Sequence, residues 1–483
     1  MRLLHNAVAL AAGILVAGCS LAPDYVRPES AIPPTLPEGG IYPPGSTDAR
    51  DISQVGWQDF FVDGRLRQVI QRGLVNNRDL RVAAANVVQA QAQYQAQHAE
   101  RLPAIGTSGS ATYANSPSAG ATFGATNAIT GTVGGDSVAT GSRDYHAVSV
   151  GFSSFEIDLF GRVRNLSKAA RERYLATEEA QRSLRISLIA EIATVWLRIA
   201  SDEDQLALSQ QTLDTFADTL KLTTAQFRLG IVSELESRQA ETNYYAARND
   251  IAQLRTRIAE DRNALNLLVG GSVEPALLPT ALGDTRFTIE ALPTDLSSTV
   301  LLRRPDVQQA EHELIAQNAN IGAARAEFFP SISLTATLGT ISPSLGSLFS
   351  GGSWAYAGSP AISLPLFDGG RLKGNLDAAN ASRDAAVATY QKTIQAAFRE
   401  VADALAERGT IDERISVQKA RASAAQAAAK LSDARYRSGV ESFLTALDAQ
   451  RTAYATEQQL ATTRLDRIGN LIELYRSLGG GLN

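Results

Sequence analysis

Apolar residues recur every seven positions along a segment without proline or glycine that runs from residue 162 to residue 229. A heptad repeat of this kind is typical of a coiled-coil seam. At about 1.5 Å per residue, the segment predicts a helix on the order of 100 Å long, which a compact globular domain does not need. The repeating residues are Ile192, Ile199, Leu206, Leu213, Leu220 and Phe227, with Val195 and Phe216 between them.

Two constant offsets relate the two halves of the chain. Residues early in the first half match residues 227 positions further along the chain, and residues later in the first half match residues 209 positions further along. The difference places 18 extra residues in the first half, within the segment 114–143, whose Gly, Ser, Thr and Ala content predicts a long loop. We therefore predict two structural repeats. The matched pairs include Pro103 with Pro330, Gly161 with Gly370 and Gly230 with Gly439.

The segments on either side of each loop alternate between apolar and small polar residues. This period of two predicts four strands of about ten residues, each with one apolar and one small polar face. A soluble sandwich and a membrane barrel both use such strands. The aromatic residues Tyr113, Trp354 and Tyr356 near the strand ends favour the membrane, where such residues gather at the interface. Four strands are too few to close a barrel, so closure would need several chains.

The amino terminus has the pattern of a secretory signal, with Arg2 followed by a largely apolar stretch and then small residues. Residues 15–20, Leu-Val-Ala-Gly-Cys-Ser, resemble the bacterial lipobox, in which the cysteine is lipidated and becomes the first residue. On that resemblance Cys19 carries a covalent lipid; an ordinary signal peptide with a chance cysteine is the alternative. Residues 20–50 are rich in Pro, Gly and Ser and predict an extended tether in which no core can be placed.

Composition excludes several classes of function. The 483 residues include 45 basic and 50 acidic side chains, so a basic surface for nucleic acid is not expected. One Cys and four His exclude disulfide frameworks and Cys/His zinc clusters, and we predict no metal site. No His-Glu-x-x-His or P-loop lysine occurs, which argues against an enzyme. Past residue 19 no uncharged apolar run of 18 residues occurs, so we expect no transmembrane helix.

Four stretches resemble the signatures of the outer membrane factors, the TolC-like exit ducts of tripartite efflux pumps. They are Arg-Arg-Pro-Asp-Val at 303–307, Ala-Ala-Arg-Ala-Glu-Phe-Phe-Pro-Ser-Ile-Ser-Leu at 323–334, Leu-Phe-Asp-Gly-Gly-Arg at 366–371 and Tyr-Arg-Ser-Gly-Val at 436–440. Leu-Ala-Pro-Asp-Tyr-Val-Arg-Pro at 21–28 is similar to the lipoprotein subgroup, which accompanies pumps of the RND class. The resemblance spans essentially the whole mature chain.

The resemblance implies a mainly α-helical protein with a membrane β-barrel. Three chains would each give four strands to a twelve-stranded barrel, continued through the periplasm by a long α-helical coiled-coil barrel. Each chain would contain two structural repeats and a lipid anchor in the bacterial outer membrane. The expected segments are a signal peptide (1–18), a lipidated tether (19–55), first-repeat helices (56–102), a first β-hairpin with a long loop (103–158), a first long helical hairpin (161–270), an equatorial region (271–300), a second-repeat helix (301–329), a second β-hairpin (330–366), a second long helical hairpin (370–478) and a C-terminal tail (479–483).

The implied function is passive conduction of drugs or other small molecules from the periplasm to the exterior. The implied partners are two further copies of the chain, a periplasmic adaptor (membrane fusion) protein and an inner-membrane RND-type transporter. In the family the tips of the helical hairpins face the adaptor, so the docking candidates are Leu229, Gly230 and Ile231 in the first half, and Ser438, Gly439 and Val440 in the second. From the residues alone, both glycines could simply be helix C-caps.

The segment 443–450 is similar to the family segment just above the tip, where an apolar residue and an aspartate project inward to close the pore. Those positions fall on Leu444 and Asp448, which lie at i and i+4 and therefore on one helix face. Some members carry a second acidic residue where this chain has Thr445, so one acidic ring is expected here. The rival hypotheses are a coiled-coil structural lipoprotein of the cell envelope without a channel, which does not explain the strands, and a lipid-anchored periplasmic enzyme.

Overall fold

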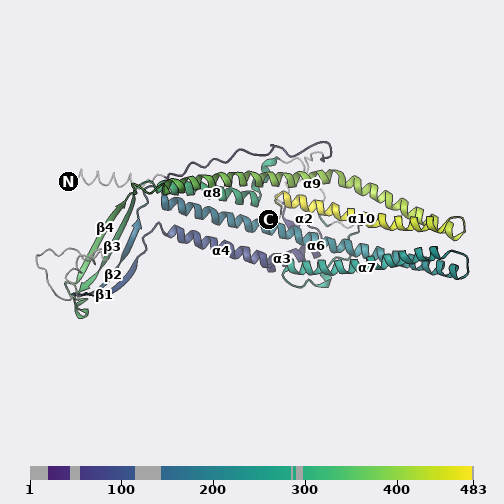
Figure 1. The fold of residues 1–483 in the computed structure, drawn as a ribbon, viewed down its shortest axis with the longest axis horizontal. Coiled ribbons are helices and arrows are strands. Elements are labelled where there is room, and N and C mark those ends of the chain that lie inside the picture. Colours follow the sequence, from purple (N-terminus) through teal and green to yellow (C-terminus); the bar gives the residue numbers. More distant parts are fainter. Residues whose placement is uncertain (1–19, 44–54, 115–142, 284–286, 290–296, 481–483) are drawn as a thin grey trace. The chain divides into compact units, whose positions relative to one another are not determined.

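The structure is a computed structural model that describes residues 20–43, 55–114, 143–283, 287–289 and 297–480. The signal peptide, Cys19 and nearly all of the predicted long loop lie outside the described residues. Within them, no helix combines the length and the apolar character that a membrane span requires. The elements in chain order are α2 (Trp57–Phe60), α3 (Gly64–Asn76), α4 (Arg78–Ala99), β1 (Gly106–Ala114), β2 (Arg143–Glu156), α6 (Arg162–Arg228), α7 (Glu234–Val269), α8 (Pro305–Ala326), β3 (Ser331–Ser342), β4 (Trp354–Ser363), α9 (Arg371–Arg437) and α10 (Phe443–Ser477), with short 3-10 turns at Pro275–Leu277, Ser298–Arg303 and Leu345–Ser347 (Figure 1).

The two longest helices confirm the internal repeat. Helices α6 and α9 each contain 67 residues, and both their first and their last residues are separated by the offset of 209. Each helix follows a glycine with positive φ, Gly161 at 79° and Gly370 at 92°. Glycine adopts this left-handed backbone conformation without the steric penalty of a Cβ atom, so the chain can turn sharply into each helix.

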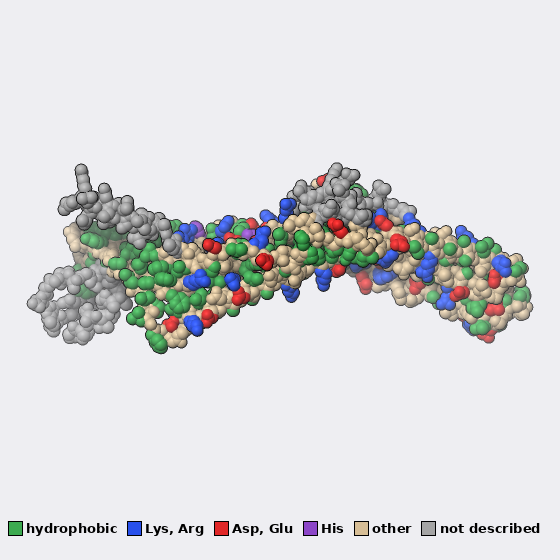
Figure 2. All heavy atoms as spheres, turned by 90° about the horizontal axis from the view of Figure 1, so that it is seen from above, with side chains coloured by type: hydrophobic (Ala, Val, Ile, Leu, Met, Phe, Trp, Pro, Cys, Tyr) green, Lys and Arg blue, Asp and Glu red, His purple; other side chains and the backbone are tan. Residues whose placement is uncertain are grey.

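The chain divides into two compact units, the first made of residues 1–28, 87–176 and 310–389 and the second of the remainder. The first unit contains an antiparallel sheet in the order β1-β2-β3-β4. Val150, Leu338 and Tyr356 are register partners across three strands and share its apolar face. Figure 2 shows hydrophobic side chains gathered over the sheet, whereas charged side chains are spread over the helices. The predicted alternation is therefore present, with the apolar face open.

A β-bulge keeps the apolar face of β2 continuous. Phe152 pairs with Ala336 and Phe155 with Leu334, so three steps on β2 match two steps on β3. Ser154 absorbs the extra residue with a φ of 55°. Without this bulge Phe155 would point to the polar face, because successive strand residues alternate between faces.

The opposite face of the sheet consists of small residues packed at close range. Ser149 pairs with Gly339, and its hydroxyl hydrogen-bonds that of Ser108 at 3.0 Å. A Cβ atom added at Gly339 would overlap the carbonyl oxygen of Val148, and one at Gly151 would overlap that of Ala336. These two positions therefore accept only glycine, and the face stays smooth and polar.

In the second unit the core includes residues of α2, α6 and α10 and of the segment that follows α7. The ring of Phe60 stacks on Tyr475 with centroids 3.9 Å apart, and the indole of Trp196 donates a hydrogen bond to the carbonyl of Leu277 at 2.9 Å. The heptad seam is fully buried at Ile192 and Ile199, half-buried further along, and 41% exposed at Phe227. A single chain thus covers its seam fully near this core and at Phe216, which is 4% exposed, and only in part elsewhere.

The segment predicted to hold the first-repeat helices, 56–102, contains α2, α3 and α4; Asp63 caps α3 at its amino terminus, and Asn77 separates α3 from α4. One sequence expectation requires correction. The described part of the tether, residues 20–43, is extended as predicted, but it is not without a core, since Leu36 is only 3% exposed. Side chains from elsewhere in the chain help to hold this segment, such as Ser298, which donates to the carbonyl of Pro33 at 2.6 Å.

Candidate functional site

The connections at the ends of the two long hairpins have the same backbone design. In the first, the amide of Gly230 donates to the carbonyl of Phe227 and that of Ile231 to Gln226, both at 2.9 Å. In the second, Gly439 and Val440 repeat both bonds at the same distances. The φ values of the two glycines are 72° and 74°. Both turns are therefore Schellman C-caps, a role that is compatible with docking.

Apolar side chains stand exposed around these turns. Leu229 is 75% exposed, and Ile231 and Val440 are each 66% exposed. Ser233 and Ser442 then cap the returning helices α7 and α10 by accepting hydrogen bonds from backbone amides. Exposed apolar residues clustered on a rigid turn are typical of a protein interaction surface.

Helix α10 begins with two contrasting faces. Phe443 and Leu447 are buried in a cluster with Ala240 of α7. Leu444, at 61% exposure, and Asp448 lie on the open face of the same turns. The structure thus brings the two predicted gate residues together on one face, with α10 anchored to the first hairpin from behind.

Tyrosines connect the second hairpin to the first. The hydroxyl of Tyr436 donates to Gln226 Oε1 at 3.0 Å, and burial, with the nearby carboxylates Glu236 and Asp433, raises the pKa of that hydroxyl. Tyr454 of α10 donates to Asp250 Oδ2 of α7 at 3.0 Å. No local sequence signal predicts these contacts, because each joins residues from different halves of the chain.

The hydroxyl of Tyr454 also lies 2.8 Å from Ser209 Oγ of α6, so this one side chain contacts both helices of the first hairpin. Burial, reinforced by the Asp250 carboxylate, raises the pKa of Tyr454 to about 12. Because the folded-state pKa lies above the ordinary value, the protonated donor is stable throughout the physiological range and is lost only as pH rises toward 12.

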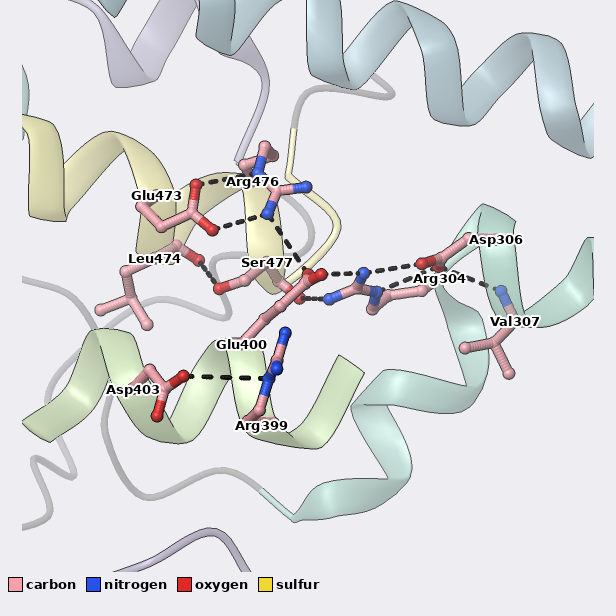
Figure 3. Close-up of polar contacts among 10 residues, drawn as sticks. All are labelled: Arg304, Asp306, Val307, Arg399, Glu400, Asp403, Glu473, Leu474, Arg476 and Ser477. Atoms are coloured by element: carbon pink, nitrogen blue, oxygen red, sulfur yellow. Dashed lines mark hydrogen bonds and ion pairs between the residues drawn. The ribbon is translucent and has the colours of Figure 1, made fainter. Parts of the chain in front are cut away.

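A buried arginine joins the start of α8, the middle of α9 and the end of α10 (Figure 3). Arg304 is 6% exposed, and its guanidinium donates to the Ser477 carbonyl at 2.7 Å, to Asp306 at 2.7 Å and to Glu400 at 3.0 Å. Arg476 reaches the same Glu400 carboxylate at 3.3 Å. We call Arg304, Asp306, Glu400, Glu473, Arg476 and Ser477 the equatorial clamp.

Each arginine of the clamp is paired directly with two carboxylates. Burial alone would lower the pKa of Arg304, but Asp306 and Glu400 hold it above its usual value. The hydrogen bond from Arg476 to Glu473, at 2.6 Å, raises the pKa of Arg476. Both guanidiniums therefore stay charged, and the sequence motif at 303–307 acquires a structural role that the sequence alone did not indicate.

The remaining predicted residues lie on the sheet. Tyr113, Trp354 and Tyr356 are 70%, 69% and 86% exposed. All three lie toward the strand ends that lead into the loops, so together they mark one rim of the sheet. Their role at a membrane interface stays a prediction.

The family model for "Outer membrane efflux protein" matches residues 69–271 and 296–480, one match for each structural repeat. The chain belongs to this family. It is therefore a channel component of the outer membrane and a transport protein, and the enzyme and pore-free lipoprotein hypotheses are not favoured. The family predicted from the signature stretches is confirmed.

Relatives and solved structures align over nearly the entire chain. It is 41% identical over 467 residues to the toluene efflux pump outer membrane protein TtgC of Pseudomonas putida, covering 97% of this chain and 93% of TtgC. It is 38% identical over 483 residues to the cation efflux system protein CusC of Escherichia coli, covering 99% and 98%. The open-state structure of the Neisseria gonorrhoeae outer membrane channel MtrE superposes with a TM-score of 0.83 at 33% identity, covering 96% and 99%.

Proposed function

We propose that three copies of this chain close one channel, which conducts small molecules passively to the exterior as the exit duct of a tripartite efflux pump. The observation that carries this proposal is the open sheet. In the described residues β1 pairs only with β2 and β4 only with β3, so each keeps one free edge. Free edges beside an exposed apolar face are unstable in water, and joining β4 of one copy to β1 of the next removes them.

The small polar face of the sheet suits the inside of such a duct. Ser149, Gly339 and Ala355 are register partners on that face and offer neither charge nor bulk. A lining of this kind supports transport of whatever an inner-membrane pump delivers. The names of the relatives fit this view, because TtgC is named for toluene and CusC for cations.

The periplasmic end supplies the partner surface. The exposed residues Leu229, Ile231 and Val440 form an apolar surface suited to a periplasmic adaptor protein, which would link the duct to an RND-type transporter. A lipid on Cys19 would fix each copy to the outer membrane. Anchoring by several acyl chains is stable, whereas one chain is marginal.

The gate consists of Leu444 and Asp448, each repeated three times around the axis. The leucine ring disfavours wetting, and the aspartate ring attracts cations. Adaptor contact at the tips would move the second hairpin outward and widen both rings. Such a two-state element needs only a few kcal/mol of differential contact to change its population.

Replacing Leu444 and Asp448 together with alanine is expected to increase single-channel conductance several-fold and to sensitise cells to large antibiotics. The increase follows because the double change removes both the apolar constriction and the acidic ring. Planar-bilayer recording and growth inhibition measure the two effects. Leu235, the repeat counterpart of Leu444 and 65% exposed, provides the control: Leu235→Ala should behave as wild type. Unchanged current together with unchanged sensitivity of the double variant would remove both residues from the gate.

A further inference from the structure

We propose that helix α8 is a docking site for the amino-terminal segment, residues 20–28, and that docking fixes where the lipid on Cys19 enters the outer membrane. The lipid would then be held at the end of α8 that leads into the sheet, and not on a freely moving tether. The inference rests on the lipid proposed for Cys19 and adds the site that positions it. All the contacts that support it lie within the first compact unit.

The amino-terminal segment is bound along one stripe of α8. Four helix residues contact it, at spacings of seven, four and three residues, which places them on one face. Arg27 donates to Glu311 at 2.8 and 2.9 Å, Asn318 donates to the Pro23 carbonyl at 2.7 Å, Ala22 lies over Gly322, and Arg325 donates to the Leu21 carbonyl at 3.2 Å. The order of these contacts shows that the segment runs antiparallel to the helix.

The lengths of the segment and of the helix stripe match. From Glu311 to Arg325 the helix rises about 21 Å, at 1.5 Å per residue. The chain from Leu21 to Arg27 spans about 20 Å when it is extended. The segment is therefore bound without slack. Arg325 lies at the end of α8, just before the sheet begins, so a group attached close to Leu21 is delivered there.

Glu311 makes the strongest contacts of the site. It is only 9% exposed, and its carboxylate accepts a hydrogen bond from the hydroxyl of Tyr25 at 3.0 Å as well as the two from Arg27. Hydrogen bonds between ionised partners are stronger than neutral ones, and a buried carboxylate depends on them. Release of the segment would remove all three bonds.

Gly322 leaves the space that the segment occupies. A Cβ atom at this position would lie 2.7 Å from the amide nitrogen of Ala22. Glycine in the interior of a helix is unfavourable relative to alanine, and the close approach of the segment explains why it stands here. Beyond Ala22, the hydroxyl of Ser20 donates at 2.9 Å to Asn165 Oδ1, near the start of α6, and Asn165 is 3% exposed. The residue next to Cys19 is therefore bound as well.

The repeat counterpart of α8 has none of the docking residues. Helix α4 matches α8 from end to end at the offset of 227, and the pairs Asp79 with Asp306 and Glu100 with Glu327 are identical. At the four docking positions, however, α4 has Ala84, Gln91, Gln95 and His98 where α8 has Glu311, Asn318, Gly322 and Arg325. The docking residues are thus confined to the repeat that binds the segment, as expected if binding the segment is their role.

Two insertions of the same twelve-residue Gly/Ser sequence test the positioning. Placed between Ser20 and Leu21, the insertion separates the lipid from the docked segment by a random coil that spans about 20 Å. Placed after Thr47, it lengthens the chain on the other side of the docked segment. In a pulse-chase experiment, newly made chains should form SDS-resistant trimers in the outer membrane several-fold more slowly with the first insertion and at the wild-type rate with the second. Palmitate labelling and density-gradient fractionation check lipidation and delivery of each variant.

A substitution on α8 tests the docking itself. Glu311→Gln should raise the rate of chymotrypsin cleavage after Tyr25 by about tenfold, as expected for loss of hydrogen bonds to a charged group, and should slow trimer formation like the first insertion. Glu313→Gln is the control, because the Glu313 carboxylate accepts from Gln317 of the same helix. It should match wild type in both measurements.

Equal rates of trimer formation from the two insertions would overturn the positioning role, since a flexible anchor is indifferent to where its tether is lengthened. Wild-type cleavage in Glu311→Gln would overturn the docking site. Wild-type chains that take up no palmitate would remove the lipid, and the inference with it. Discrete current steps from those same chains would still support the shared duct, so the two proposals can fail separately.

Discussion

Replacing Arg304 with alanine is expected to lower the free energy of unfolding by about 3 kcal/mol, because it removes the buried donor of the Ser477 carbonyl and leaves Glu400 with Arg476 alone. The guanidinium is 6% exposed, so water would not readily take its place. Thermal or denaturant unfolding of the purified protein, followed by circular dichroism, measures the loss. Efflux should fall with it, since Arg304 would no longer hold the middle of α9 and the end of α10 together.

The neighbouring Arg303 provides a control that distinguishes loss of the buried Arg304 contacts from a general loss of positive charge. Arg303 is exposed, and Arg303→Ala should leave unfolding within about 0.5 kcal/mol of wild type. Arg304→Lys keeps the charge but not the planar fork, so its stability should be intermediate. An Arg304→Ala protein that unfolds together with wild type would refute the role assigned to the clamp.

The second large effect is expected at the hairpin tips. Introducing glutamate at both Leu229 and Val440 should reduce drug resistance to the level of a strain that lacks the protein. The two side chains are 75% and 66% exposed, and a docking surface that must exclude water cannot accept unpaired carboxylates at both positions. Growth inhibition by pump substrates measures the loss, and bilayer conductance should remain.

Leu267 offers the control for that experiment, because it is 78% exposed on α7 but lies at the opposite end of the helix from the tip. Leu267→Glu should retain full resistance. Wild-type resistance in the double tip variant would exclude these residues from adaptor docking.

Local signals explain why so much of the fold could be predicted. The offset of 209 gave both ends of α6 and α9, because the glycines that begin and end each helix act through their own backbone conformation. The strands followed from alternation between faces, a property of each strand by itself. Leu444 and Asp448 share a face for an equally local reason, the helical period.

The contacts that hold the helices together could not be predicted, because they depend on distant partners. Tyr245 and Tyr454 occupy equivalent repeat positions, yet only Tyr454 meets the Asp250 carboxylate. Arg304 belongs to a recognised stretch, but its partners Glu400 and Ser477 lie on helices far along the chain. The bulge at Ser154 has no proline or glycine to signal it.

Single-channel recording of the purified full-length protein tests the central claim most directly. If three chains share one duct, the preparation should insert into a planar bilayer as a trimer and give discrete current steps. A folded monomer that never conducts, with the apolar strand faces covered by its own residues, would contradict the account.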